Sequence, residues 1–315
     1  MGIKSAIATS VAALFCLVSS AGNAQVIFSE SFESGDMSAT NPDGFSWDRN
    51  NNTSVVTQDA NDGPVAIYNN ATIYNPHSTT MPDGSVRDWT PKDGQNSLRV
   101  RYAAGKEWAE QRFDFGAGYP EVWFSYHIRV PLNYTRGIDG PAAGRNGKWM
   151  SLLMKDMSGY SENNITMIII SDWPTADNKG IVLESQLRTG TTGDFSTKSP
   201  TYNNFVTPGD AGRWMQVIYH MKASSSIGAN DGSFKVYRKW EDESRFTLIN
   251  SLEGIPADVT QASIAAGYNG WGGGYFMGYA NDPYANDTEW LIDDITISTT
   301  SLLKSPPKPP TILNP

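Results

Sequence analysis

The chain has 315 residues, of which 39% are hydrophobic and 18% charged, and its formal net charge at pH 7 is −9. This composition excludes a coiled coil, a collagen-like chain and a wholly disordered one. An acidic chain with no Lys/Arg-rich block also argues against nucleic acid as a partner. The low charge content, together with 10 Trp, 14 Tyr and 29 Gly, favours an all-β extracellular domain.

The first residues have the features of a secretory signal peptide. Lys4 supplies the positive charge, Ala6–Ser20 is apolar, and small residues precede a predicted cut after Ala24. We therefore predict a signal peptide over residues 1–24, secretion to the extracellular space or periplasm, and no membrane anchor after cleavage. Cys16 is the single cysteine and lies in this segment, so the mature chain has no disulfide and no cysteine-based metal or catalytic site.

Period-two alternation of apolar and polar residues recurs between Gly-, Asn-, Asp- and Pro-rich turns, which is typical of strands. It is clearest in Glu121–Val130, where every second side chain is apolar. The predicted strands are Val26–Phe32, Ser97–Tyr102, Glu107–Phe115, Glu121–Val130, Lys148–Asp156, Ile165–Ser171, Lys179–Arg188, Arg213–Lys222, Ser233–Trp240, Thr247–Leu252 and Glu289–Ser298.

No internal repeat or change of composition divides these strands. We predict one all-β domain over residues 25–300, folded as a two-sheet antiparallel β-sandwich, and a Pro-rich tail or linker over residues 301–315. The polar stretch Asn41–Asp93 has little strand signal and is expected to be a long excursion. The Gly-rich aromatic stretch Tyr268–Tyr279 is predicted to be a loop.

The two ends of the domain carry the most specific pattern. FSESFESGDMS (Phe28–Ser38) and EWLIDDITIS (Glu289–Ser298) resemble the opening and closing strands of concanavalin A-like jelly rolls and carbohydrate-binding modules. The resemblance implies a structural Ca²⁺ ion, which prefers hard oxygen ligands. Its ligands would be Glu33, the carbonyl of Gly35, Asp293 and Asp294. The alternative is that these acids are ordinary turn and edge residues. No organic cofactor is indicated.

The middle of the chain carries a second resemblance. GYPEVWFSYHIRVP, GKWMSLLMKD, GRWMQVIYHMKA and DGSFKVYRKW resemble core strands of secreted jelly-roll polysaccharide lyases. Three motifs of the alginate lyases of this fold have partial counterparts in Glu110-Gln111-Arg112, Gln186-Leu187-Arg188 and Tyr275–Tyr279, and none is complete. The resemblance implies a protein that cleaves an acidic polysaccharide by β-elimination in a groove on one sheet.

This chemistry needs a group that neutralises the uronate carboxylate, a base for the carbon-bound proton and an acid for the leaving oxygen. Arg and Gln suit the first role, and His suits proton transfer near neutral pH. The polar strand faces supply the predicted catalytic residues His127, Arg129, Gln186, Arg188 and His220. The predicted substrate-binding residues are Arg112, Lys155, Glu184, Lys222, Tyr268, Trp271 and Tyr275, whose charges and aromatic rings suit an acidic polysaccharide.

A non-catalytic carbohydrate-binding protein, lectin-like or adhesive, is the alternative on the same fold. The absence of a complete catalytic motif favours the binder, and the domain size and polar strand faces favour the enzyme. Convergence of the five predicted catalytic residues in one groove would favour the enzyme, and scatter would favour the binder. The Glu-x-Asp-x-x-Glu strand of laminarinase-type hydrolases is absent, as are serine-hydrolase and zinc-protease motifs.

Overall fold

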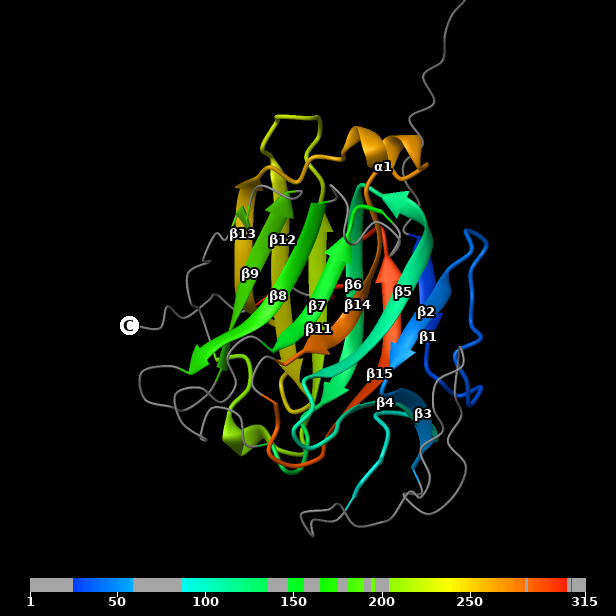
Figure 1. The fold of residues 1–315 in the computed structure, drawn as a ribbon, viewed down its shortest axis with the longest axis vertical. Helices are drawn as coiled ribbons and strands as arrows, with labels where there is room; N and C mark the ends of the chain where they lie inside the picture. Colours follow the sequence, from blue (N-terminus) through cyan, green and yellow to red (C-terminus); the bar gives the residue numbers. More distant parts are fainter. Residues whose placement is uncertain are drawn as a thin grey trace, which may run out of the picture.

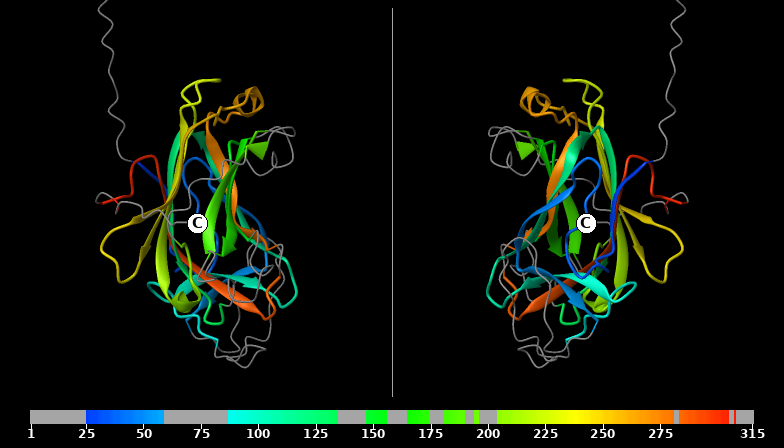
Figure 2. Two further views of the ribbon diagram at one scale, coloured as in Figure 1. Left: turned by 90° about the vertical axis from the view of Figure 1, so that its left-hand side faces the viewer. Right: turned by 90° about the vertical axis from the view of Figure 1, so that its right-hand side faces the viewer.

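The chain folds as two antiparallel sheets that pack face to face, as predicted. The computed structural model describes residues 25–58, 87–134, 147–155, 165–174, 181–189, 194–195, 204–280, 283–304 and 307. The predicted signal peptide lies outside this part of the chain. Figure 1 shows one sheet in front of the other, and the side views in Figure 2 show the two layers on edge.

Eight of the described strands form one sheet, called sheet A. Its hydrogen-bonded order is β13-β12-β11-β6-β15-β4-β3, and β1 also pairs with β15. The strands are β1 (Val26–Glu30), β3 (Thr53–Thr57), β4 (Asn96–Tyr102), β6 (Glu121–Arg129), β11 (Trp214–Lys222), β12 (Gly232–Trp240), β13 (Thr247–Ile255) and β15 (Thr288–Ser298).

Seven described strands form the second sheet, called sheet B, in the order β10-β9-β8-β7-β14-β5-β2. A short helix, α1 (Gln261–Ala265), lies at one end of the sandwich (Figure 1). The strands are β2 (Ser46–Asn51), β5 (Trp108–Tyr119), β7 (Lys148–Leu153), β8 (Ile165–Pro174), β9 (Ile181–Thr189), β10 (Asp194–Phe195) and β14 (Trp271–Tyr279).

Aromatic side chains from both sheets fill the space between them. Phe113 of sheet B lies 5.2 Å, centroid to centroid, from Phe124 of sheet A and 5.3 Å from Phe276 of its own sheet. Trp149 of sheet B meets Trp290 of sheet A edge to face at 4.7 Å. Each large aromatic ring removes much apolar area from water. This core supplies the cohesion that disulfides provide in many secreted domains.

All eleven strands predicted from alternation are present, with end points that differ by a few residues. Alternation works well here because each sheet buries one face against the other. On β6, for example, Val122, Phe124 and Tyr126 point into the core, while His127 faces outward. The period of two therefore reports the inward and outward faces directly.

The stretch Asn41–Asp93 contains two strands that were not predicted, β2 and β3. β2 is the edge strand of sheet B and pairs with β5, and of its side chains Trp47 alone enters the core. A strand that buries a single ring leaves little periodic signal. β3 is the edge strand of sheet A and pairs with β4. The expectation of a strandless excursion is therefore wrong for these residues.

The predicted loop over Tyr268–Tyr279 is also corrected, because most of it is strand β14, between β5 and β7. Its glycines suggested a loop, yet here they permit close approach of neighbouring strands. A Cβ atom on Gly274 would lie 2.1 Å from the carbonyl oxygen of Ser151. A Cβ on Gly272 would lie 2.3 Å from the ring of Tyr268. Neither position has room for a side chain.

The first residues of the predicted tail pack against the domain. Leu302 and Leu303 lie against a small apolar cluster on the outer face of sheet A that includes Trp123, Tyr237 and Phe246. Partial burial of these two leucines stabilises the end of the chain beyond β15. The tail residues 305–306 and 308–315 lie outside the described part of the chain.

The two core tyrosines Tyr126 and Tyr219 allow a test of this packing. Their hydroxyl oxygens are 2.9 Å apart, and both side chains are fully buried. Replacing Tyr126 by Phe leaves the Tyr219 hydroxyl without this partner, so we expect a loss of about 1–2 kcal/mol in the free energy of unfolding. Tyr126→Phe combined with Tyr219→Phe should cost less than the sum of the single changes. Urea unfolding of the four proteins measures this, and strictly additive losses would contradict it.

Candidate functional site

The five predicted catalytic side chains lie on both outer faces of the sandwich. His127 and Arg129 on β6 and His220 on β11 face outward from sheet A, because their neighbours along each strand point into the core. Gln186 and Arg188 on β9 face outward from sheet B. The core separates the two groups. The expectation of one groove lined by all five residues is therefore corrected.

On sheet A, Arg129 forms an ion pair with an acidic neighbour, and His127 lies beside another acid. Nη2 of Arg129 lies 2.7 Å from Oδ2 of Asp88. Nδ1 of His127 lies 3.5 Å from Oδ2 of Asp294. Burial, reinforced by two nearby lysines, lowers the pKa of His127 to about 4. His127 is therefore neutral at pH 7.

His220 and Lys222, also on sheet A, lie near the end of the sandwich that carries α1. The His220 ring stacks on Trp123 at 3.9 Å, its Nε2 is 2.7 Å from Oε1 of Glu121, and burial lowers its pKa. Lys222 lines a pocket of about 440 Å³, together with Ile227 and Ile264. None of the five predicted catalytic residues lines this pocket.

Residues 87–95, called the strap, lie against the outer face of sheet A and lead into β4. Trp89 of the strap packs with Val56, Trp214 and Leu291 in a small buried cluster. Its indole Nε1 donates to Oε2 of Glu289 on β15 at 2.9 Å. The strap is thus fixed to the sheet by both apolar and polar contacts.

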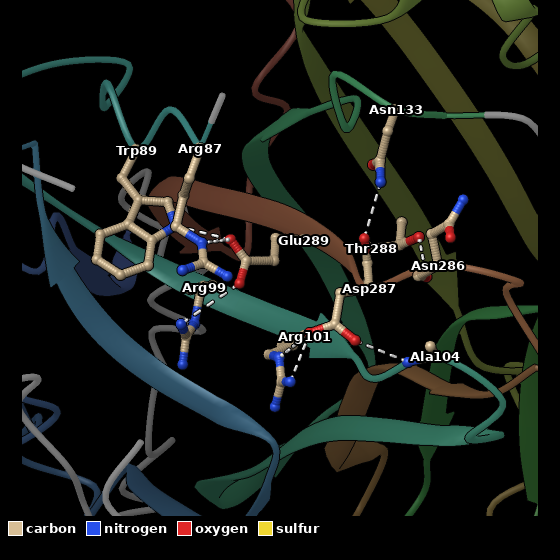
Figure 3. Close-up of polar contacts among 10 residues, drawn as sticks. All are labelled: Arg87, Trp89, Arg99, Arg101, Ala104, Asn133, Asn286, Asp287, Thr288 and Glu289. Atoms are coloured by element: carbon tan, nitrogen blue, oxygen red, sulfur yellow. Dashed lines mark hydrogen bonds and ion pairs between the residues drawn. The ribbon is translucent and has the colours of Figure 1, made fainter. Parts of the chain in front are cut away.

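Glu289 is the centre of a buried ion cluster that sequence reasoning missed (Figure 3). Its carboxylate lies 3.1 Å from Nε of Arg87 and 3.5 Å from Nη1 of Arg99. Both guanidinium groups also lie over the ring of Trp89, at 5.5 and 5.1 Å. These contacts place two arginines and one carboxylate around a single indole ring, an arrangement that holds the strap in place.

Asp287, just before β15, makes a second group of contacts in the same region (Figure 3). Its carboxylate accepts from Nε of Arg101 and from the main-chain amide of Ala104, both at 2.9 Å. The Asn133 side chain donates to the Asp287 carbonyl at 2.8 Å. These bonds connect β4, and the residues just after β6, to the start of β15.

The predicted calcium ligand Glu33 accepts main-chain hydrogen bonds instead. Its carboxylate oxygens accept from the amides of Gln95 and Asn96 at 3.0 Å. Gly94 allows this approach, because it has a φ of +65° and a Cβ there would lie 2.3 Å from the Glu33 carboxyl carbon. Gly35 lies in a turn with a φ of +79°.

The predicted ligand Asp293 is fully buried and has the same role as Glu33. Its Oδ2 accepts from the strap amides of Lys92 at 2.9 Å and Asp93 at 3.4 Å, and its Oδ1 accepts from the amide of Asp294 at 2.8 Å. Burial and the neighbouring Asp294 carboxylate raise the pKa of Asp293 to about 7. Burial and Asp93 raise the pKa of Asp294.

These contacts do not form the calcium site that the resemblance implies. Across the described residues, no three or more His, Cys, Asp or Glu side chains are placed to hold a metal ion. The carboxylates of Glu33 and Asp293 are directed toward main-chain amides. Calcium therefore stays a prediction, which a comparison of the melting temperature in Ca²⁺ and in EDTA will test.

The outer face of sheet B carries a row of polar residues in register. Arg112 on β5 is opposite Tyr275 on β14, which is opposite Ser151 on β7. Ser151 pairs with Ile168 on β8, and Ile168 pairs with Gln186 on β9. Directly opposite residues of antiparallel strands project on the same side. Four polar residues from strands that are far apart in sequence thus line up across the sheet.

The row is flanked by two buried acids. Glu110 is 4% exposed and pairs with Nε of Arg112, and Glu184 is 8% exposed and accepts from Nε2 of Gln186 at 2.9 Å. Tyr275 is 2% exposed, whereas Arg112 and Gln186 are partly exposed. Charged and polar groups are rarely buried on an outward sheet face without a reason, and such groups mark candidate binding sites.

The remaining predicted sugar-binding residues lie around this face or beneath it. Tyr268 directs its hydroxyl to Oδ1 of Asp114 at 3.3 Å, and its ring covers Gly272. Lys155 follows β7 and lies beside Gly272. Trp271 points into the core and is fully buried, so it is a packing residue and not an exposed sugar-stacking ring.

Two residues of this face, Glu110 and Ser151, were not among the predicted site residues. The available signal was a polar residue that interrupts an apolar strand, as Ser151 does in the segment KWMSLL. Such an interruption identifies a polar position but not the sheet toward which it faces. The pairing of β7 with β14 supplies that information.

No protein-family model matches the sequence, and no curated protein matches it. Similar solved structures include the cellulose-induced protein Cip1, with 14% identity over 88% of this chain and 100% of its own and a TM-score of 0.40. Lectin II from Ulex europaeus has 10% identity over 88% and 100%, with a TM-score of 0.38. The Ca²⁺/Man2-bound VIP36 exoplasmic/lumenal domain has 13% identity over 67% and 78%, with a TM-score of 0.39.

These three likenesses are distant, and the strand pairing itself defines the two-sheet antiparallel sandwich. Within the described residues, no helix has the length and apolar character needed to span a membrane.

The raised pKa of Asp293 predicts a pH dependence of stability. Because its folded-state pKa of about 7 lies above the usual value of 3.8, the ionised side chain is disfavoured in the folded protein. Its stabilising contribution is complete below about pH 4 and is lost as the pH rises through 7. Asp293→Asn is always uncharged, so its stability relative to wild type should rise between pH 4.5 and 8. Urea unfolding at several pH values measures this difference.

The exposed Glu107 provides the control, because Glu107→Gln removes a carboxylate from a surface position. Its stability relative to wild type should change little across the same pH range. A pH-independent difference between Asp293→Asn and wild type would contradict the assignment.

Proposed function

We propose that the protein binds an extended polysaccharide across the outer face of sheet B. The observation that carries the proposal is the row formed by Arg112, Tyr275, Ser151 and Gln186 across five adjacent strands. Five strands at about 4.8 Å spacing span roughly 19 Å from the first to the last. This length accommodates several sugar rings laid across the strands.

The chemistry of the row suits a sugar with carboxylate groups. Glu110 occupies the Nε side of the Arg112 guanidinium, which leaves the Nη groups to donate to a ligand. Gln186 is partly exposed and supplies an amide, while Tyr275 and Ser151 are buried and place hydroxyl groups beneath the face. Guanidinium and amide donors recognise carboxylates and sugar hydroxyls with defined geometry. An acidic polysaccharide is thus the ligand class that we assign to this face.

Cleavage by β-elimination is the second candidate, favoured by the position of Arg112 directly opposite Tyr275. In such a step a base removes the proton from C5 of the uronate, the C4–C5 double bond forms, and the C4–O bond breaks. The leaving oxygen then takes a proton. Arg112 would neutralise the carboxylate and Tyr275 would transfer the proton. His127 and His220 take no part in this step, because they lie on the opposite sheet.

Secretion forms part of the proposal. Residues 1–24 have the sequence of a cleavable leader, and the apolar core needs no disulfide. An acidic polysaccharide outside the cell is the ligand that such a protein would meet. Release of the mature chain beginning at Gln25 into the medium or periplasm, read by N-terminal sequencing, is the corresponding observation.

The binding proposal is tested by Arg112→Gln, which removes the guanidinium. We expect the affinity for polygalacturonate or alginate to fall about tenfold or more, the loss expected for a charge-assisted hydrogen bond. Lys239→Gln removes one positive charge from β12 of sheet A, on the opposite outer face, and should leave affinity unchanged. Arg112→Lys separates charge from geometry, because lysine cannot form the same fork of hydrogen bonds. Isothermal titration calorimetry gives the affinities, and circular dichroism confirms folding.

Equal affinities for wild type and a folded Arg112→Gln would overturn the assignment of this face. The elimination step is read separately, as absorbance near 235 nm from unsaturated uronate products. A rise with wild type that Tyr275→Phe abolishes would establish the lyase, and binding without any rise would leave a carbohydrate-binding protein.

A further inference from the structure

A ladder of three side chains lies at one end of the polar face of sheet B. Trp108 begins β5, Tyr279 ends β14, and Lys148 begins β7, so the three come from adjacent strands. The rings of Trp108 and Tyr279 are stacked, with centroids 5.6 Å apart and an interplanar angle of 15°. The Lys148 ammonium lies 5.6 Å from the centre of the Tyr279 ring. Tyr279 is thus flanked by an indole on one side and an ammonium on the other.

The ladder faces outward. Tyr279 is 40% exposed, one of the few large hydrophobic side chains exposed in the described chain, and Trp108 and Lys148 are partly exposed. The residue next to each of them along its strand, Ala109, Ala280 or Trp149, belongs to the core. The ladder therefore lies on the same side of sheet B as Arg112 and Tyr275.

Lys148 differs from Arg112 in its electrostatic environment. Arg112 forms an ion pair with the buried Glu110. Lys148 has no ion pair with any described carboxylate, and its ammonium lies over the Tyr279 ring. A cation–π contact holds the ammonium in position without neutralising its charge. Its N–H donors are therefore available to an anion.

Gly278 brings this charge close to the polar row. The residue has a φ of +128°, and a Cβ there would lie 2.9 Å from Cε2 of Tyr275 and 3.2 Å from Cβ of Lys148. The absence of a side chain at Gly278 allows Tyr275 and the Lys148 stem to approach each other. The ammonium is consequently placed at the edge of the row that begins with Arg112 and Tyr275.

We infer that Lys148, held by the ring of Tyr279, is the residue that selects a carboxylate-bearing sugar at this end of the face. The inference rests on the proposed polysaccharide binding and assigns its charge specificity to one residue. A uronate carboxylate would accept hydrogen bonds from the Lys148 ammonium while its sugar ring lies beside Tyr275. A neutral sugar in the same position would leave the partly buried ammonium without this partner.

The test compares polygalacturonate with its carboxyl-reduced form, which has the same backbone without the charges. Wild type should bind polygalacturonate at least about tenfold more tightly than the reduced polymer. Lys148→Met keeps the length of the stem and removes the charge. It should lose most of this preference by weakening the binding of polygalacturonate, and its affinity for the reduced polymer should remain near that of wild type. Lys148→Arg retains the charge and should retain the preference.

Lys239→Met is the matched control, since Lys239 lies on β12 of the opposite sheet with its ammonium 5.2 Å from the centre of the Phe246 ring, and its loss should keep the preference. Equal weakening of both polymers by Lys148→Met, or an unchanged preference, would overturn the role of Lys148 while leaving the polysaccharide face in place. Equally tight binding of dextran sulfate to wild type would overturn the selection of carboxylates. If wild type binds neither polymer, the proposed function itself fails, and the inference fails with it.

Discussion

Hydrogen bonds from main-chain amides to two carboxylates, one on β15 and one just after β1, hold one end of the molecule together. Asp293 accepts hydrogen bonds from the amides of Lys92 and Asp93, and Glu33 accepts them from the amides of Gln95 and Asn96. A hydrogen bond to an ionised acceptor is roughly twice as strong as a neutral one. Three amides of the strap and the amide of Asn96, the first residue of β4, are thereby fixed without a covalent link, in a chain whose single cysteine, Cys16, precedes the described fold.

β15 is suited to this task because it is the most connected strand of sheet A. It pairs with β4, β6 and β1, so the closing strand joins the N-terminal strand to the centre of the sheet. The charges on and beside it, Asp287 and Glu289, hold Arg101, Arg87 and Arg99 (Figure 3). A burial cost accompanies each of these carboxylates, and it is offset where amides and guanidinium groups surround them. The raised pKa of Asp293 shows that its hydrogen bonds offset the cost of burying its charge only in part.

The fold was predictable because the alternation of apolar and polar residues shows which side chains are buried. The site was not predictable, since alternation carries no information about which sheet a strand joins. His127 and Gln186 both occupy polar positions of well-predicted strands, yet their strands belong to opposite sheets. Long-range pairing decides this, and no local pattern encodes it. The strands β1 and β15, from the two acidic segments Phe28–Ser38 and Glu289–Ser298, pair with each other. The carboxylate oxygens of Glu33 and Asp293 accept hydrogen bonds from main-chain amides. Residue type alone does not distinguish this arrangement from metal binding.

The glycines of β14 explain both the missed strand and the form of the candidate face. Gly274 brings the strand against the carbonyl of Ser151, and Gly278 brings Tyr275 against Lys148. The residues that made this stretch look like a loop are those that gather the polar side chains. Within that face, a ligand carboxylate at Arg112 must compete with Glu110, which is already in place and buried. Lys148 has no such competitor among the described residues. Charge selection at this end of the face therefore falls to the lysine, while Arg112, oriented by its acid, binds the polysaccharide through its remaining donors.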